Sequence, residues 1–142
     1  AAQAYVDAAT LAPLTTGKVG DAYDGLFDTS VSTNATGPDR AALTDDGIAE
    51  ATTSPEITAT PVRIDALADK DGKVLLLGAT FDLDVRAESA AGPVSVHRTN
   101  ELTYAPVDGT WKITAYRVDV QRDTPEGATS TTADTTTETT TK

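Results

Sequence analysis

Apolar positions follow two different spacings along this chain of 142 residues. Over roughly the first 50 residues they recur every three or four positions, which places them on one face of a helix. From Ile57 onward they alternate with polar residues, which is the spacing of a strand with one buried face. This change of period predicts an α+β fold in which N-terminal helices pack on one face of an antiparallel sheet.

Three helices are expected before the sheet. The first covers residues 1–12 and ends before Pro13, because the residue preceding a proline avoids the helical conformation. The second covers residues 19–27, whose apolar side chains form one stripe at helical spacing. The third covers residues 38–47, with a proline at its first position and a glycine at its end.

Three turn signals divide the remaining sequence into four strands of a meander. These signals are Asp69–Gly72, Ala90–Pro93 and Pro106–Gly109. In the second strand every other residue from Leu75 to Ala87 is apolar, and the residues between them are polar from Thr80 onward. One face of the sheet is therefore expected to be core, and the other is expected to face water.

The first and fourth strands add two local expectations. The first strand is expected to place three side chains in the core: Val62, Ile64 and Ala66. The apolar residues of the fourth strand occupy one phase up to Ile113 and the opposite phase from Tyr116 onward. One residue near positions 114–115 must therefore be extra, which predicts a β-bulge that helps the sheet to curve around the helices.

The C-terminal residues 123–142 differ from the rest, because they are rich in Thr and carry no large aliphatic or aromatic side chain. Such a segment cannot offset an ordering entropy of about 1–2 kcal/mol per residue, so it is expected to be disordered. One domain over residues 1–122 remains, which is long enough to bury a core without metals or disulfides. The net charge of −11 disfavours binding to nucleic acid or anionic lipid.

The residue types exclude several kinds of reactive site. The chain has no Cys, which excludes thiolate nucleophiles, iron–sulfur clusters and cysteine-ligated zinc. His97, the one histidine, shares the outward phase with Glu101 and is expected on the surface. Glycines 47 and 72 do not align with the ligands of a calcium-binding EF-hand loop. We therefore predict no catalytic residue, no metal and no cofactor.

Two polar residues interrupt the core-facing phase of the third strand, namely Arg98 and Asn100. One interpretation is a ligand pocket, in which Arg98 pairs with an anionic group and Asn100 orients the ligand. Tyr116 and Tyr23 would line the same cavity.

The other interpretation of these polar residues needs no ligand. It is a local change of strand register, or an internal ion pair between Arg98 and a helix acid such as Asp7 or Asp24. This second interpretation is favoured, because structural ion pairs also place charged residues at such positions.

Three stretches and the order of the elements resemble a known family. The stretches are Tyr5-Val6-Asp7-Ala8, Tyr23-Asp24-Gly25-Leu26-Phe27, and Glu101-Leu102-Thr103-Tyr104 through Trp111-Lys112-Ile113. Together they resemble the cystatin-like cone of the nuclear transport factor 2-like superfamily, and within it the extracytoplasmic, Mce-associated-type domains of actinobacteria. The resemblance covers about residues 3–122 and implies three helices on a curved, four-stranded antiparallel sheet. The superfamily includes isomerases, dehydratases, ligand carriers and non-catalytic adaptors, so the fold does not choose among these functions.

The leading functional hypothesis is a non-catalytic extracytoplasmic domain that binds or scaffolds a cell-envelope partner, either a protein or a lipid-like ligand. Because the sequence lacks an initial Met, we expect a secreted chain or one anchored by a segment upstream of residue 1. The longest apolar run is too short to cross a bilayer. The alternative is a small-molecule binding cone, or a weak isomerase- or dehydratase-like enzyme, with a pocket near Arg98, Asn100 and Tyr116. A homodimer through the sheet is a further possibility, and it predicts a contiguous exposed apolar patch.

Overall fold

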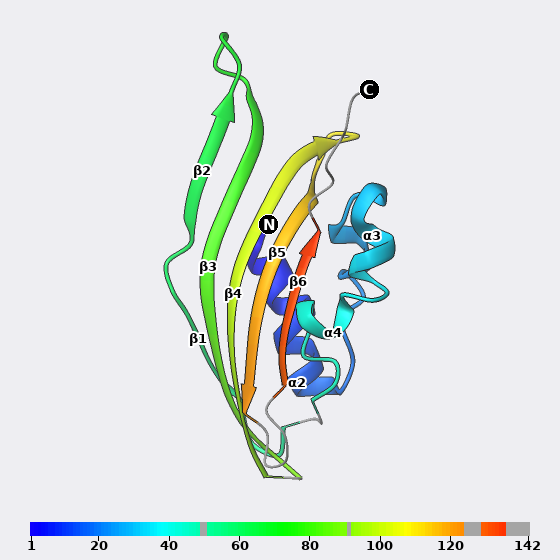
Figure 1. Ribbon diagram of the computed structural model, residues 1–142, viewed down its shortest axis with the longest axis vertical. Helices are drawn as coiled ribbons and strands as arrows, with labels where there is room; N and C mark the ends of the chain where they lie inside the picture. Colours follow the sequence, from blue (N-terminus) through cyan, green and yellow to red (C-terminus); the bar gives the residue numbers. More distant parts are fainter. Residues whose placement is uncertain (49–50, 91, 124–128, 136–142) are drawn as a thin grey trace.

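Helices on one face of an antiparallel sheet make up the fold, as the sequence predicts (Figure 1). The computed structural model describes residues 1–48, 51–90, 92–123 and 129–135. The strands are β1 (Glu56–Ala59), β2 (Arg63–Ala68), β3 (Val74–Ser89), β4 (Gly92–Val107), β5 (Thr110–Asp123) and β6 (Thr129–Thr135). Their order is β1-β3-β4-β5-β6, and β2 also pairs with β3, so that β1 and β2 follow each other along one edge.

The first helix passes through Pro13 and does not end before it, so that prediction is wrong. Three consecutive segments form it: α1 (Ala2–Val6), the π-helical η1 (Asp7–Leu11) and α2 (Ala12–Thr16). The N–H of Ala12 bonds to the carbonyl of Asp7, five residues back, and the wider turn accommodates the proline. The helix ends at Gly17, whose φ of 71° suits a glycine.

The π-helical turn leaves two backbone carbonyls for donors outside the helix. Pro13 has no N–H to give to Ala9, and the N–H of residue 12 bonds to residue 7 instead of Ala8. The carbonyl of Ala8 accepts the N–H of Gly20, and that of Ala9 accepts the N–H of Asp45, each at 2.9 Å. The proline therefore helps to attach two later segments to the first helix.

The predicted helix over residues 19–27 is also wrong. The structure has a loop there, with one 3₁₀ turn, η2 (Asp24–Leu26). A Cβ at Gly20 would lie 3.0 Å from the Cα of Ala8, so this close crossing of loop and helix favours glycine. The apolar positions keep part of their predicted role, because Tyr23 and Phe27 are buried with their rings edge to face.

Two short helices follow the loop. The sequence pattern missed α3 (Thr29–Ala35), although Asp28 caps it by accepting the N–H of Ser30 at 2.9 Å. Helix α4 (Arg40–Leu43) lies within the predicted third helix but is shorter.

The long strands confirm the alternation in the half of the sheet that the helices cover. The inner face, which we define as the face toward the helices, is buried from Ala79 to Ala87 in β3 and from Val94 to Tyr104 in β4. The predicted bulge is confirmed at Thr114, because Tyr104 pairs with Ile113 while the preceding residue of β4 pairs with Ala115.

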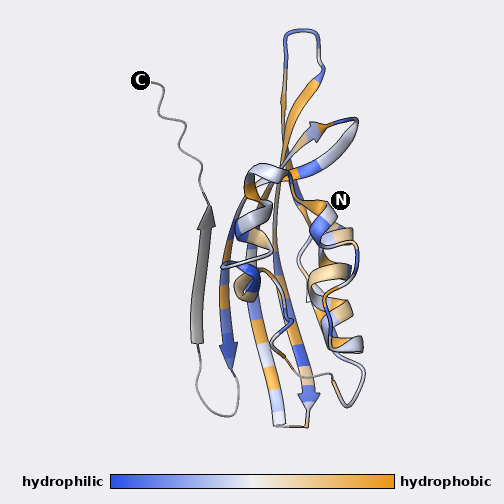
Figure 2. Cartoon of the chain, turned by 90° about the vertical axis from the view of Figure 1, so that its right-hand side faces the viewer, coloured by the Kyte–Doolittle hydropathy of each residue, from blue (hydrophilic) through white to orange (hydrophobic). Residues whose placement is uncertain are grey.

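The first predicted strand is split in two, and its expected core residues are exposed. Strand β1 pairs with residues 83–86 of β3, whereas β2 pairs with residues 74–80. All six residues of β2 are exposed, as is Val62 just before it. The β2–β3 hairpin projects beyond the helices, so no helix in the described part of the chain covers the inner face toward its tip (Figures 1 and 2). The placement of Val62, Ile64 and Ala66 in the core is therefore wrong.

Within the tail that is expected to be disordered, Thr129–Thr135 pair antiparallel with β5 as strand β6. Thr is β-branched and suits a strand, and the edge of β5 supplies main-chain partners. Residues 124–128 and 136–142 lie outside the described residues.

Candidate functional site

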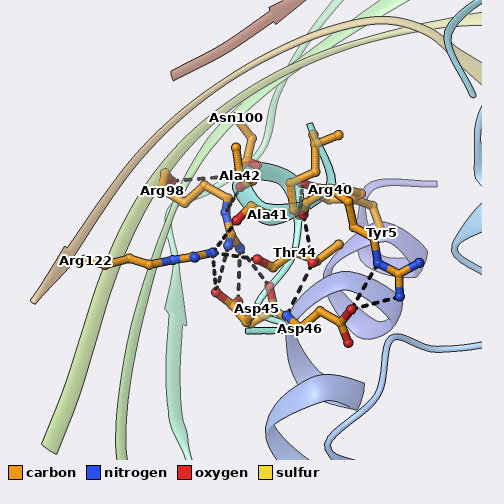
Figure 3. A network of polar contacts seen from close by, with 12 residues as sticks. Tyr5, Arg40, Ala41, Ala42, Thr44, Asp45, Asp46, Arg98, Asn100 and Arg122 are labelled. Carbon is orange, nitrogen blue, oxygen red and sulfur yellow. Dashed lines mark hydrogen bonds and ion pairs between the residues drawn. The ribbon is translucent and has the colours of Figure 1, made fainter. Parts of the chain in front are cut away.

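Arg98 lies in the middle of β4, fully buried under the helices. Its Nη2 donates to Oδ1 of Asp45 at 2.7 Å, and its Nη1 donates to Oδ2 at 3.1 Å (Figure 3). Nη1 also donates to the hydroxyl of Thr10 at 3.0 Å, and Nε donates to the carbonyl of Ala42 at 3.2 Å. Burial alone would lower the pKa of Arg98, but the charge and hydrogen bonds of Asp45, together with Tyr5 and Tyr23, outweigh burial and raise that pKa. The guanidinium is thus held charged and is bound by four protein oxygens.

Three elements position Asp45 against this guanidinium. The residue follows α4 in the chain, and its N–H bonds to the carbonyl of Ala9 on the first helix. From β5, Arg122 donates to the carbonyls of Ala41 and Thr44 at 2.7 and 2.6 Å, and its Nη2 lies 3.6 Å from Oδ1 of Asp45 (Figure 3). The α4 turn is therefore fixed between the first helix and the sheet by polar contacts.

The ion-pair interpretation of Arg98 gains support, but with a different acid from those suggested. Asp7 and Asp24 are exposed, and Asp7 accepts a hydrogen bond from Gln3. The pairing of β3, β4 and β5 is regular around Arg98, so no register change occurs there. Asp45 lies near the end of the predicted third helix, and the sequence pattern gives no signal that distinguishes it from Asp46 as the partner of Arg98.

The other three candidate ligand-binding residues also form hydrogen bonds within the fold, but the buried amide oxygen of Asn100 has no partner among the described residues. Tyr23 donates its hydroxyl to the carbonyl of Ala35 at 2.9 Å, and Tyr116 donates to Asp39 at 2.7 Å. The amide nitrogen of Asn100 donates to the carbonyl of Arg98 at 3.3 Å. Tyr23 and Tyr116 both contact the ring of Phe27, with centroids 5.0 and 5.9 Å away. The tyrosines thus belong to one aromatic cluster, whereas Arg98 belongs to the Asp45 network.

His97 is exposed, as its outward phase predicts, and lies on the outer face, opposite the helices. Its partner is Asp84 on β3, with 2.7 Å between Nδ1 and Oδ1. Within the described ranges, no group of three or more His, Asp or Glu side chains is arranged to hold a metal ion.

Two apolar grooves open where the first helix meets the edge of the sheet. Groove A, of about 430 Å³, has its main apolar lining from Val6, Leu11, Ile57, Val62 and Phe81. Groove B, of about 420 Å³, has its main lining from Ala2, Val62, Ile64, Leu77, Tyr104 and Trp111. Val62 lines both grooves, so they are neighbours along the inner face of the β2–β3 hairpin.

Tyr104 supplies a polar group beside groove B. Its hydroxyl is buried and has no hydrogen-bond partner within the described part of the chain. Burial raises the pKa of Tyr104 to about 12. The sequence pattern assigned this residue to the core and gave no indication of a groove beside it.

Two further findings complete the description. The described residues include no helix long and apolar enough to span a membrane. A search of family models, of curated proteins and of solved structures finds no match to this chain.

Proposed function

We propose that this chain is a non-catalytic extracytoplasmic domain that binds a cell-envelope partner through grooves A and B. The bidentate contact between Arg98 and Asp45 carries the proposal. Asp45 pairs with the guanidinium of Arg98, which is the group that would otherwise bind an anionic ligand in the core. Arg98 also donates hydrogen bonds to Thr10 and Ala42. The charged group in the interior is thus engaged within the fold, and the exposed apolar surface is left for binding.

The distribution of exposed apolar side chains supports a binding surface at the grooves and the hairpin. Single exposed apolar residues are common, but a contiguous group of them is typical of an interaction site. Large exposed apolar side chains in the described part of the chain are Leu11, Val62, Ile64, Leu67, Leu75, Leu76 and Trp111. Leu11, Val62, Ile64 and Trp111 line the grooves, and Leu75 continues the same inner face of the hairpin. Leu67 and Leu76 pair with each other and lie on the outer face.

The extracytoplasmic part of the proposal rests on the resemblance of the sequence to envelope domains of the nuclear transport factor 2-like superfamily. The small-molecule alternative at Arg98, Asn100 and Tyr116 is not proposed, because the guanidinium of Arg98 is paired with Asp45 and the hydroxyl of Tyr116 donates to Asp39.

Photo-crosslinking in intact cells tests the binding surface. A benzophenone amino acid at Trp111, in groove B, is expected to give a discrete adduct with an envelope component. The same probe at Gln121, which is exposed on β5 away from both grooves, is the matched control. Equal adducts at both positions, or none at Trp111, would contradict binding through the grooves.

Protease treatment tests the location. A protease added outside spheroplasts is expected to degrade the chain without lysis. Degradation that requires lysis would contradict an extracytoplasmic location and would leave the crosslinking result to be judged separately.

A further inference from the structure

Strand β2 is an open edge of the sheet. It pairs with β3 on one side, and no strand among the described residues pairs with its other side. All six of its residues are exposed, and Ile64 and Leu67 are exposed by 54% and 57%. Proteins commonly protect such an edge with Lys, Pro or a bulge, because its free N–H and C=O groups can pair with another chain. Strand β2 contains no Pro, its one register shift with β3 lies at its end, between Leu67 and Ala68, and its two charged residues have opposite signs.

The two faces of β2 differ in chemistry. Ile64 pairs with Ala79 and Ala66 with Leu77, which places these residues on the inner face beside groove B. Arg63 and Asp65 alternate with them and point to the outer face. Leu67 also lies on the outer face, where it pairs with Leu76. A strand added to this edge would therefore continue an apolar surface on the inner side and meet the two charges and Leu67 on the outer side.

The charges on β2 are complementary to those of a second copy. Arg63 and Asp65 form an ion pair of 3.0 Å along their own strand, with side chains 76% and 63% exposed. If two copies of β2 pair antiparallel about a two-fold axis at Ile64, Arg63 lies opposite Asp65 of the partner subunit, and the reverse pair forms by symmetry. Opposite charges at facing positions stabilise a strand pair, whereas like charges destabilise it. The strand has no net charge, although the whole chain carries −11.

We propose that this chain forms a two-fold dimer through antiparallel pairing of β2 with β2, centred on Ile64. Main-chain hydrogen bonds join the two sheets into one, as in other cases of strand addition. Ile64 packs against its counterpart on the inner face, and the two copies of groove B then lie on either side of the axis. This inference goes beyond the proposed function and does not depend on it, because a dimer of this geometry can form with or without an envelope partner.

Sedimentation equilibrium of the purified full chain tests the dimer. The wild type is expected to reach twice the monomer mass as concentration rises. Arg63→Asp and Asp65→Arg each place like charges opposite each other and are expected to raise the dissociation constant roughly tenfold. Mixing the two variants restores opposite charges at both positions, so a one-to-one heterodimer of wild-type strength is expected.

A matched control comes from a second Arg–Asp pair with the same spacing. Arg117 and Asp119 on β5 are also two residues apart and exposed, with 3.6 Å between their charged groups, but they do not lie on β2. Arg117→Asp is expected to leave the dimer unchanged. Ile64→Lys, which places a charge on the axis, is expected to abolish it.

Two results would overturn the dimer. The first is a wild-type chain that stays monomeric up to about 1 mM, the weak end of specific association. The second is a dimer that Arg63→Asp, Asp65→Arg and Ile64→Lys leave unaffected, since association would then occur elsewhere. Recovery on mixing excludes misfolding as the cause of a lost dimer, and neither result depends on the crosslinking experiment in cells.

Discussion

Strand β3 passes through two environments while its sequence keeps one pattern. From Ala79 to Ala87 its inner side chains lie under the helices and are buried. Nearer the hairpin turn the same phase continues at Leu75, which is 41% exposed because the helices do not extend so far. Alternation therefore identifies which side chains share a face, whereas burial depends on whether another element covers that face.

The two environments also use charge differently. In the covered half, Arg98 and Asp45 are fully buried and bind each other with bidentate geometry. In the uncovered half, Arg63 and Asp65 form an exposed ion pair at the sheet edge. A buried pair is costly to break because the remaining charge cannot regain its hydration, whereas an exposed pair loses little.

Breaking the buried pair should have the largest effect. Asp45→Ala leaves Arg98 charged, buried and unpaired, so we expect a loss of about 3–5 kcal/mol in the free energy of unfolding. Urea denaturation followed by circular dichroism measures it. The control is Asp7→Ala, at an exposed acid, for which we expect a change within about 0.5 kcal/mol. Equal losses for the two variants would show that Asp45 is not essential to the core.

Truncating two leucines on the inner face of β3 compares the covered part of the sheet directly with the uncovered part. Leu83 is fully buried, so Leu83→Ala is expected to cost about 2–5 kcal/mol through lost contacts and a cavity. Leu75→Ala, in the uncovered part, is expected to cost less than about 1 kcal/mol. Chemical denaturation at a concentration where the chain is monomeric measures both. Similar costs would mean that the hairpin is covered in solution.

Two tyrosines on the covered side differ in their hydroxyl partners. Tyr5 donates to the carbonyl of Leu43 at 2.7 Å, whereas the hydroxyl of Tyr104 is buried without a partner in the described ranges. Tyr5→Phe is therefore expected to cost about 1 kcal/mol or more, and Tyr104→Phe to be neutral or stabilising. Thermal unfolding of both variants measures the contrast. A larger loss for Tyr104→Phe would reveal a partner for its hydroxyl.

The same tyrosines predict how stability changes at high pH. Burial raises the pKa of Tyr104 from its ordinary value of 10.0 to about 12, and burial also raises the pKa values of Tyr5 and Tyr23. The contribution of Tyr104 is thus complete below pH 10 and is lost as the pH rises toward 12. Denaturation midpoints measured across this range should fall, with a smaller fall in Tyr104→Phe. A midpoint independent of pH would contradict the burial of these hydroxyls.

The sequence predicts those parts of the fold that depend on local spacing. The long strands, their turns and the bulge at Thr114 follow from alternation and from its change of phase. The first helix was predicted too short, because the penalty at Pro13 is relieved by a π-helical turn and by bonds from Gly20 and Asp45. Those donors come from distant segments, so no local pattern contains them.

The candidate site was also predicted only in part, because some of its contacts come from segments that are distant in the sequence. The phase of β4 identifies Arg98 as a buried charge, but the choice of Asp45 over Asp7 or Asp24 depends on how α4 packs. The exposure of Ile64 depends on the length of the helices relative to the hairpin. Both are properties of tertiary packing, and spacing along one strand does not determine them.

The two neighbouring residues His97 and Arg98 on β4 allow the closest comparison of an exposed contact with a buried ion pair. Breaking the exposed contact is expected to have the smallest effect on stability. His97 and Arg98 point to opposite faces, and each lies 2.7 Å from an aspartate oxygen. The side chains of His97 and Asp84 are 46% and 56% exposed, so water replaces their contact when one is removed. Asp84→Ala is therefore expected to change the free energy of unfolding by less than about 1 kcal/mol. A double-mutant cycle with His97→Ala measures the coupling, which added salt should reduce further. If Asp84→Ala cost as much as Asp45→Ala, distance and not burial would determine the strength of ion pairs in this sheet.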